Sequence, residues 1–316
     1  MAGLMTKIDI RQGDALNEFG AIEDASVDLI IADPPYNLGK DYGNLSDKKT
    51  KEEYLEFTRL WIKEAVRVLK DNGTIYVFMG VRFISHLYVV LEEEFELDFN
   101  SWIVWHYTQG MGKTKGFSPR HDDILMFTKG KKPCFNLDEV RIPQKFYRQR
   151  NNMRGANPGD VWEFSHVHYS NPNRKPHPTQ KPEGLIERLV LASSSKENVV
   201  LDPFSGSGTT ARVCQQLGRN FIGFELNSEY VEMTRERLAD DFDSFDSIDP
   251  RSKRVPNDLR KEDIRNEYLK NHISWFLAHH ENAYDEFRKN VLEKYGVDIK
   301  DLERSEIKTF DLFGNS

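Results

Sequence analysis

Cysteine is scarce in this chain, since only Cys134 and Cys214 occur among its 316 residues. The two lie far apart, and neither belongs to a CxxC pair. This spacing excludes a disulfide framework and a cysteine-based zinc cluster, and we expect no bound metal. So little cysteine also fits a protein of the cytoplasm.

Long apolar runs are missing as well. Stretches such as Leu87–Leu91 are far shorter than the roughly 20 residues that a helix needs to cross a bilayer. Residues 1–7 lack the apolar centre of a secretion signal. We therefore expect a soluble, cytoplasmic protein with no membrane partner.

An excess of positive charge is absent from the chain as a whole. It carries 51 acidic and 44 basic residues and a net charge of −7, which argues against a nucleic-acid partner. Residues 101–175 are different, because 13 Lys and Arg stand there against six Asp and Glu. The positive charge is thus concentrated in one segment.

Apolar runs and helical periodicity alternate along most of the chain, which predicts an α/β fold with a doubly wound, mostly parallel sheet. The expected strands are 8–12, 27–32, 74–78, 98–107, 198–201 and 220–225, and the expected helices are 51–69, 81–93, 183–194, 209–217 and 228–238. The alternation stops at Thr108, and we expect residues 108–175 to be irregular. Beyond an acidic spacer, 240–249, the sequence again reads as helical.

A glycine-rich turn follows the expected strand at 198–201. Gly206 and Gly208 allow unusual backbone angles and close approach of a ligand, and the next helix presents free N–H groups. Glu225 ends the next strand, 23 residues after Asp202, where an acidic side chain can bind ribose hydroxyls. Together these features indicate a nucleoside site, although the turn alone is also compatible with a structural role.

A second turn, Asp33-Pro34-Pro35-Tyr36, ends the strand at 27–32, because successive prolines cannot donate to a sheet. The Asp33 carboxylate and the Pro34 carbonyl are both acceptors and suit the two N–H groups of an exocyclic amine. Tyr36 is suited to stack on a flat base. A base in duplex DNA reaches such a site only after it is flipped out of the stack.

The two turns resemble the catalytic and cofactor motifs of DNA amino-methyltransferases that use S-adenosylmethionine. The catalytic motif comes first, the basic segment second and the glycine motif third, which is similar to the permuted beta class of adenine-N6 and cytosine-N4 enzymes of restriction-modification systems. His177–Pro182 and Gly13–Ala15 resemble two further motifs of that class. The resemblance implies a Rossmann-like fold in which the two turns share one cavity.

It also implies the site residues. The catalytic set is Asp33, Pro34, Pro35 and Tyr36. The set expected to bind S-adenosylmethionine is Asp14, Ala15, Asp33, Thr179, Lys181, Asp202, Phe204, Ser205, Gly206, Ser207, Gly208, Thr209 and Glu225. An Asp at the first catalytic position favours adenine N6 over cytosine N4.

The basic segment lies where the beta class carries its target-recognition region. We expect DNA contacts from Lys113, Lys115, Lys129, Lys131, Lys132, Lys145, Arg148 and Arg150. The expected division is a catalytic half of the core at 1–107, a target-recognition region at 108–175, a cofactor-binding half at 176–239, and an acidic spacer with a helical extension at 240–316. Dimerisation, DNA clamping and capping of the core are alternative roles for the extension.

The expected activity is therefore methylation of adenine N6 in double-stranded DNA, with a cognate restriction endonuclease and a second copy of the chain as further candidate partners. Cytosine-N4 methylation and a catalytically silent DNA-binding regulator are the alternatives. Pro133-Cys134 superficially resembles the nucleophile motif of cytosine-C5 enzymes, but its position relative to the glycine motif is wrong. We interpret Cys134 as a bystander thiol.

Overall fold

The protein is described here from a computed structural model. The described residues are 6–39, 48–108, 110, 112–142, 155–167, 174–242, 289 and 292–293. The chain divides into two compact units, residues 1–136 with 159–248, and residues 137–158 with 249–316. Among the described residues no helix is both long and apolar enough to span a membrane.

The first unit is built on one sheet. Its strands are β1 (Ile8–Gln12), β2 (Val27–Ala32), β3 (Leu69–Met79), β4 (Asp98–His106), β5 (His121–Thr128), β6 (Val161–Glu163), β7 (Val199–Asp202) and β8 (Asn220–Glu225). They lie in the order β1-β8-β7-β2-β3-β5-β4-β6. All neighbouring strands are parallel except at β5, which runs antiparallel to β3 and β4.

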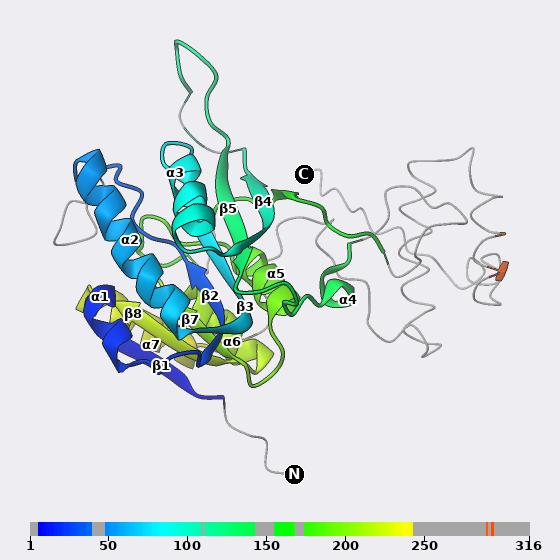
Figure 1. Ribbon diagram of the computed structural model, residues 1–316. Helices are drawn as coiled ribbons and strands as arrows, with labels where there is room; N and C mark the ends of the chain where they lie inside the picture. Colours follow the sequence, from blue (N-terminus) through cyan, green and yellow to red (C-terminus); the bar gives the residue numbers. More distant parts are fainter. Residues whose placement is uncertain are drawn as a thin grey trace. The chain divides into compact units, whose positions relative to one another are not determined.

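Helices cover both faces of this sheet, as Figure 1 shows. On one face pack α1 (Ala15–Glu18), α2 (Lys51–Val68) and α3 (Ile84–Val89), and on the other α5 (Glu183–Ser193), α6 (Thr209–Leu217) and α7 (Ser228–Ala239). The expected doubly wound α/β fold is confirmed. The short α4 (Leu137–Val140) belongs to the second unit.

The helix α2 shows how local sequence sets these elements. Thr50 caps its first turn, since its Oγ1 accepts the backbone N–H of Glu53 and the Glu53 carboxylate accepts the Thr50 N–H. Tyr54, Trp61 and Ala65 recur at helical spacing and are buried against the sheet.

Three sequence expectations need correction. The strand expected at 74–78 begins at Leu69, directly after α2, and the Asn72-Gly73 pair lies in a bulge of β3. Asn72 adopts a φ of +62° there. The helix expected at 81–93 is shorter, since α3 passes into a π-helical turn at Val90–Glu94.

The third correction concerns residues 108–175, which are not irregular throughout. Residues His121–Thr128 form β5, a central strand between β3 and β4. Both its faces are buried, so it lacks the alternating pattern that marks a half-exposed strand. The C-terminal helical expectation falls almost wholly outside the described residues.

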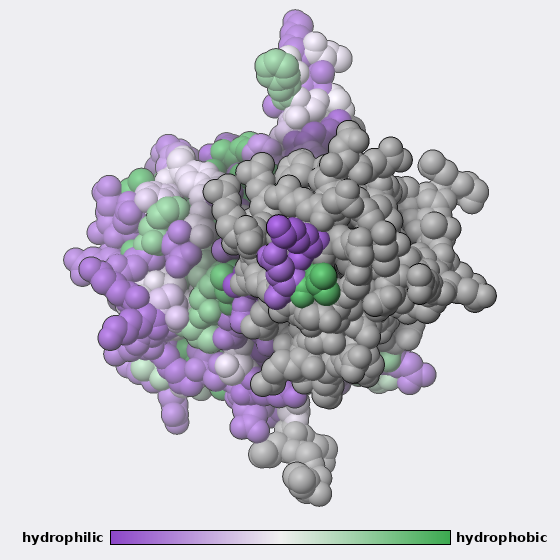
Figure 2. Space-filling view, turned by 90° about the vertical axis from the view of Figure 1, so that its right-hand side faces the viewer, coloured by the Kyte–Doolittle hydropathy of each residue, from purple (hydrophilic) through white to green (hydrophobic). Residues whose placement is uncertain are grey.

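The strand order brings the carboxyl ends of the parallel strands together at one edge of the sheet. The carboxyl ends of β8, β7, β2, β3 and β4 meet there, together with the amino end of β5, because β5 runs the other way. The connection between β4 and β5 projects from the same edge, at the top of Figures 1 and 2.

Candidate active site

One cavity of about 860 Å³ lies along this edge, and both sequence motifs line it. Residues 33–36 reach it from the end of β2 and residues 202–207 from the end of β7. The two strands are parallel neighbours, with Ile30 opposite Leu201, so their carboxyl ends deliver the two turns side by side. The expectation that the turns share a cavity is confirmed.

The turn after β2 is fixed by groups from outside it. The Tyr54 hydroxyl donates a hydrogen bond of 2.8 Å to the Pro35 carbonyl. Asn37, at a φ of +56°, is buried, and its side-chain amide exchanges two hydrogen bonds with the backbone of Lys49. The acceptors at the start of the turn are therefore held on a rigid backbone.

Asp33 is paired with Lys181, and both residues line the cavity. The Asp33 Oδ2 accepts a hydrogen bond from the Lys181 ammonium, while its Oδ1 is buried and has no hydrogen-bond partner among the described residues. The Lys181 Nζ also lies 5.4 to 5.9 Å from the ring centroids of Tyr36, Phe78 and Trp105. Cation–π attraction therefore reinforces the ion pair.

The glycine turn is held together by Asp202 from within. Asp202 accepts hydrogen bonds from the Phe204 N–H (3.0 Å) and the Thr210 hydroxyl (2.6 Å). Burial raises the pKa of Asp202 to about 7, and these two donors oppose the rise. Both carboxylate oxygens of Asp202 therefore accept hydrogen bonds from the turn and from the start of α6.

Glu225 links the end of β8 to the same turn. Its Oε2 accepts the Gly206 N–H at 2.8 Å and its Oε1 accepts the Asn227 N–H at 2.8 Å. Burial raises the pKa of Glu225, while these backbone donors counteract the rise. Gly206 adopts a φ of +51°, which suits glycine at this tight approach.

Gly208 stands apart from the other predicted residues of the turn, because it does not line the cavity. It is the left-handed N-cap of α6, with a φ of +72°. A Cβ at this position would overlap the Thr234 side chain. The structure therefore gives Gly208 a packing function in the turn.

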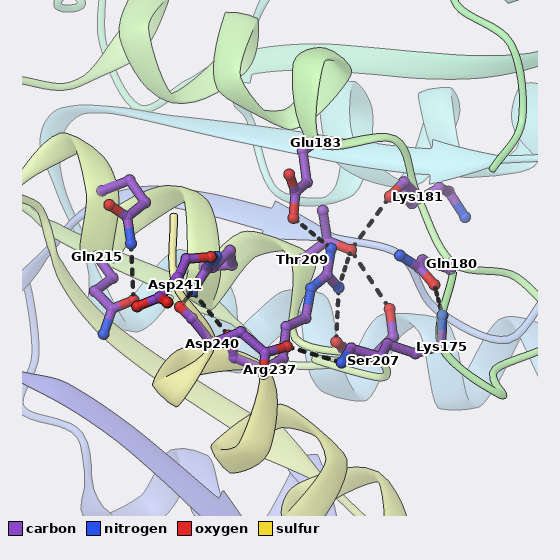
Figure 3. A network of polar contacts seen from close by, with 12 residues as sticks. Lys175, Gln180, Lys181, Glu183, Ser207, Thr209, Gln215, Arg237, Asp240 and Asp241 are labelled. Atoms are coloured by element: carbon purple, nitrogen blue, oxygen red, sulfur yellow. Dashed lines mark hydrogen bonds and ion pairs between the residues drawn. The ribbon is translucent and has the colours of Figure 1, made fainter. Parts of the chain in front are cut away.

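A buried polar network ties the glycine turn to the Lys181 segment (Figure 3). Arg237 of α7 donates to the Ser207 carbonyl, to the Thr209 hydroxyl and to Glu183, the first residue of α5. The Arg237–Glu183 pair is 2.7 Å long, with side chains 4% and 6% exposed. Thr209 in turn donates to the Lys181 carbonyl at 3.2 Å.

The remaining predicted residues of the cofactor set also reach the cavity. Asp14 and Ala15 follow β1, and Asp14 caps α1 by accepting the Leu16 N–H at 2.9 Å. The Thr179 N–H donates to the His177 Nδ1 at 3.3 Å. Burial, with the positive charge of Lys181 as a smaller cause, lowers the pKa of His177 to about 4.

The sequence did not indicate three cavity residues at the β4–β5 end, namely Tyr107, Asp122 and His166. The Tyr107 hydroxyl donates to Asp122 at 3.3 Å, and its ring centroid lies 4.0 Å from that of His166. Burial and the charge of Asp122 raise the pKa of Tyr107. A correct prediction of β5 from the sequence would have placed Asp122 at this edge of the sheet.

The predicted DNA-contact residues fall into three groups. Lys113 and Lys115 are exposed on the projecting β4–β5 connection. Lys129 lies at the opposite edge of the sheet, where its ammonium donates to the Val66 and Leu69 carbonyls. The adjacent Lys131 and Lys132 follow it there. This placement argues against DNA contacts at the cavity for those three residues, while Lys145, Arg148 and Arg150 lie outside the described residues.

Comparison with known proteins defines the class. Residues 27–236 match the family of DNA methylases. The chain is 60% identical over 283 residues to the type II methyltransferase M.HpaI of Haemophilus parainfluenzae, covering 89% of this chain and 90% of that protein. It is 38% identical over 242 residues to the DNA adenine methyltransferase YhdJ of Escherichia coli strain K12, with 72% and 82% covered.

Solved structures agree with this assignment. The complex of M1.HpyAVI with S-adenosylmethionine matches with a TM-score of 0.50 and 28% identity, covering 73% of this chain and 100% of that one. The PvuII cytosine-N4-specific DNA methyltransferase matches with a TM-score of 0.60, 18% identity and coverage of 85% and 93%, which shows the shared fold.

The chain therefore belongs to the DNA methylase family. It is a DNA methyltransferase of the restriction-modification type, and it uses S-adenosylmethionine to methylate DNA.

Proposed function

We propose that this enzyme methylates the N6 amine of adenine in a short duplex sequence, and that it belongs to the beta class. The observation that carries the proposal is the shared cavity, in which Asp33 and Tyr36 lie beside the glycine turn and Glu225. The YhdJ relative is named a DNA adenine methyltransferase, which supports the choice of adenine.

In this proposal Asp33 and the Pro34 carbonyl accept the two N–H groups of the target amine. These acceptors draw the nitrogen lone pair out of conjugation with the ring and leave it available for attack. Tyr36 stacks on the base and offsets part of the cost of flipping it out. The turn, fixed by Tyr54, would hold the amine in one position beside the bound cofactor, and positioning of this kind contributes several kcal/mol to catalysis.

The cavity residues fit S-adenosylmethionine. A volume of about 860 Å³ lies within the roughly 300–1,000 Å³ common for ligand sites. Asp14, Phe204, Gly206 and Glu225 line the part of it beside β1, β7 and β8. When bound, the cofactor supplies a methyl group on sulfur with a thioether as leaving group. In this proposal Glu225 binds the ribose hydroxyls and Asp14 the adenine of the cofactor.

The same site geometry also suits the N4 amine of cytosine, so the test must identify the product. Duplex DNA methylated with labelled cofactor is digested to nucleosides, which are then separated. We expect the label in N6-methyl-2′-deoxyadenosine. Label in N4-methyl-2′-deoxycytidine would replace the adenine assignment, and DNA binding without any incorporation would indicate a silent regulator.

The wider setting is part of the same proposal. A restriction endonuclease that cuts the unmethylated sequence is the expected partner, and the enzyme meets its DNA in the cytoplasm. A homodimer is a further proposed assembly, which sedimentation of the purified protein tests directly.

A further inference from the structure

The tip of the β4–β5 connection carries an exposed aromatic side chain. Phe117 is fully exposed, at 101%, whereas the next most exposed large apolar residue among the described ones, Val161, is at 66%. The Lys113 N–H donates to the Ser118 hydroxyl at 2.7 Å, which closes the turn around Phe117. The segment projects at the top of Figures 1 and 2, and Figure 2 shows mainly hydrophilic residues on it.

The two ends of this connection lie at the active-site cavity. Tyr107 before it and Asp122 after it both line the cavity, and the Tyr107 N–H donates to the Arg120 carbonyl at 2.9 Å. The base of the loop is therefore continuous with the paired strands β4 and β5. The loop thus begins and ends at residues of the cavity wall.

The charge of the loop indicates the chemistry of its partner. Residues 108–121 contain Lys113, Lys115 and Arg120 but no Asp or Glu, although the chain as a whole is acidic. Such a group attracts phosphates, and it surrounds an aromatic ring that no described contact buries. A polyanion with an apolar interior, which is the stack of bases in duplex DNA, matches both features.

We propose that Phe117 inserts into the DNA stack beside the target base and fills the space that the flipped base leaves. The inference rests on the proposed function, because base flipping creates the gap. Apolar side chains enter base steps in this manner in proteins that distort DNA, and an occupied gap disfavours return of the base. Lys113 and Lys115 then contact the flanking phosphates.

The test compares two duplexes that contain the sequence methylated by the wild-type enzyme. In one the target base is paired, and in the other it lies opposite an abasic site and is already free to leave the stack. We expect Phe117→Ala to reduce the methylation rate on the paired duplex by about 10- to 100-fold and on the unpaired duplex by less than about threefold. Phe117→Trp, which keeps a large ring, should retain most of the rate on both.

Phe135→Ala is the matched control. Phe135 is also an exposed phenylalanine, at 44%, but it lies at the other edge of the sheet, beside Asn136, whose N–H donates to the Ala192 carbonyl. It should leave both rates unchanged. Lys113→Ala should lower both rates alike and reduce their dependence on salt.

The outcomes separate this inference from the proposed function. If the wild-type enzyme methylates cytosine N4 and not adenine N6, the proposed adenine specificity fails, and the two duplexes are then made with that cytosine as the target base. If the wild-type enzyme methylates both duplexes, but Phe117→Ala reduces the methylation rate equally on both or leaves both rates unchanged, only the insertion proposal is overturned. A change in sedimentation of Phe117→Ala, with unchanged rates, would instead assign the ring to contact with a second copy of the chain and would also overturn the proposal.

Discussion

Lys181 and Asp33 form an ion pair inside the active-site cavity, although 148 residues separate them in the chain. The pair occupies one oxygen of the proposed catalytic carboxylate, and the other oxygen is buried. Lys181 thus approaches the catalytic turn, whereas the sequence motif associates it with the cofactor. We infer that Lys181 holds the Asp33 carboxylate in its orientation.

Replacement of Lys181 by Met tests this positioning role. The variant keeps an apolar side chain beside the three rings but removes the ammonium group that donates to the Asp33 Oδ2. We expect a loss of at least about tenfold in methylation rate, because the acceptor of the target amine is no longer held in position, with the affinity for S-adenosylmethionine changed by less than about threefold. Methylation rates and calorimetric titration with S-adenosylmethionine check this.

Lys70→Met is the control for that experiment. Lys70 pairs with Asp28 at 2.8 Å, at the amino ends of β2 and β3 and therefore away from the cavity. The change thus also breaks a lysine–aspartate pair. The methylation rate of Lys70→Met should match that of the wild type. Loss of cofactor binding together with the rate in Lys181→Met would mean that the lysine does not act by positioning Asp33.

Glu225→Gln should weaken binding of S-adenosylmethionine. Both carboxylate oxygens of Glu225 accept backbone N–H groups, and glutamine offers a single acceptor oxygen for them. We expect the dissociation constant to rise by about tenfold or more, as measured by calorimetric titration. Glu229→Gln, an exposed change at the start of α7, serves as the control, and equal affinities for all three proteins would refute the ribose-binding role.

His177 should make the folded protein sensitive to acid. Its pKa is about 4 when folded and near 6.5 when unfolded, so the unfolded chain binds the additional proton between these values. Stability is therefore lost as the pH falls from about 6.5 towards 4, by up to about 3 kcal/mol.

Urea unfolding of the wild type and of His177→Gln, at pH 5 and pH 7, measures this contribution. The buried Asp202 has a raised pKa and acts in the opposite direction, because its folded form binds the extra proton in that range. It is present in both proteins, so it cancels in the comparison. The wild type should lose more stability on acidification than the variant, and equal losses would contradict the assignment.

The site was predictable from the sequence to the extent that short turns follow buried strands. Asp33 and Asp202 each stand directly after an apolar run, and parallel strands bring such positions to one edge. The Arg237–Glu183 pair was not predictable, because it joins two helices through a contact that no local pattern marks.

The β5 strand and the lysines near it show a second limit. The acidic pair Asp122-Asp123 and the surrounding polar residues hid a strand that is buried on both faces. When β5 is not predicted, Lys113 and Lys129 are assigned to one basic segment. With it, they lie at opposite edges of the sheet, because the strand carries the chain from one edge to the other.

The methylation rate of Asp33→Ala, measured together with its binding of S-adenosylmethionine and of duplex DNA, tests the central claim most directly. We predict a rate at least on the order of 100- to 1,000-fold below that of the wild type, because the acceptor for the target amine is gone, with both affinities within about threefold. Methylation at the wild-type rate, or loss of both binding activities together with the rate, would contradict the claim that Asp33 acts on the amine of the flipped base.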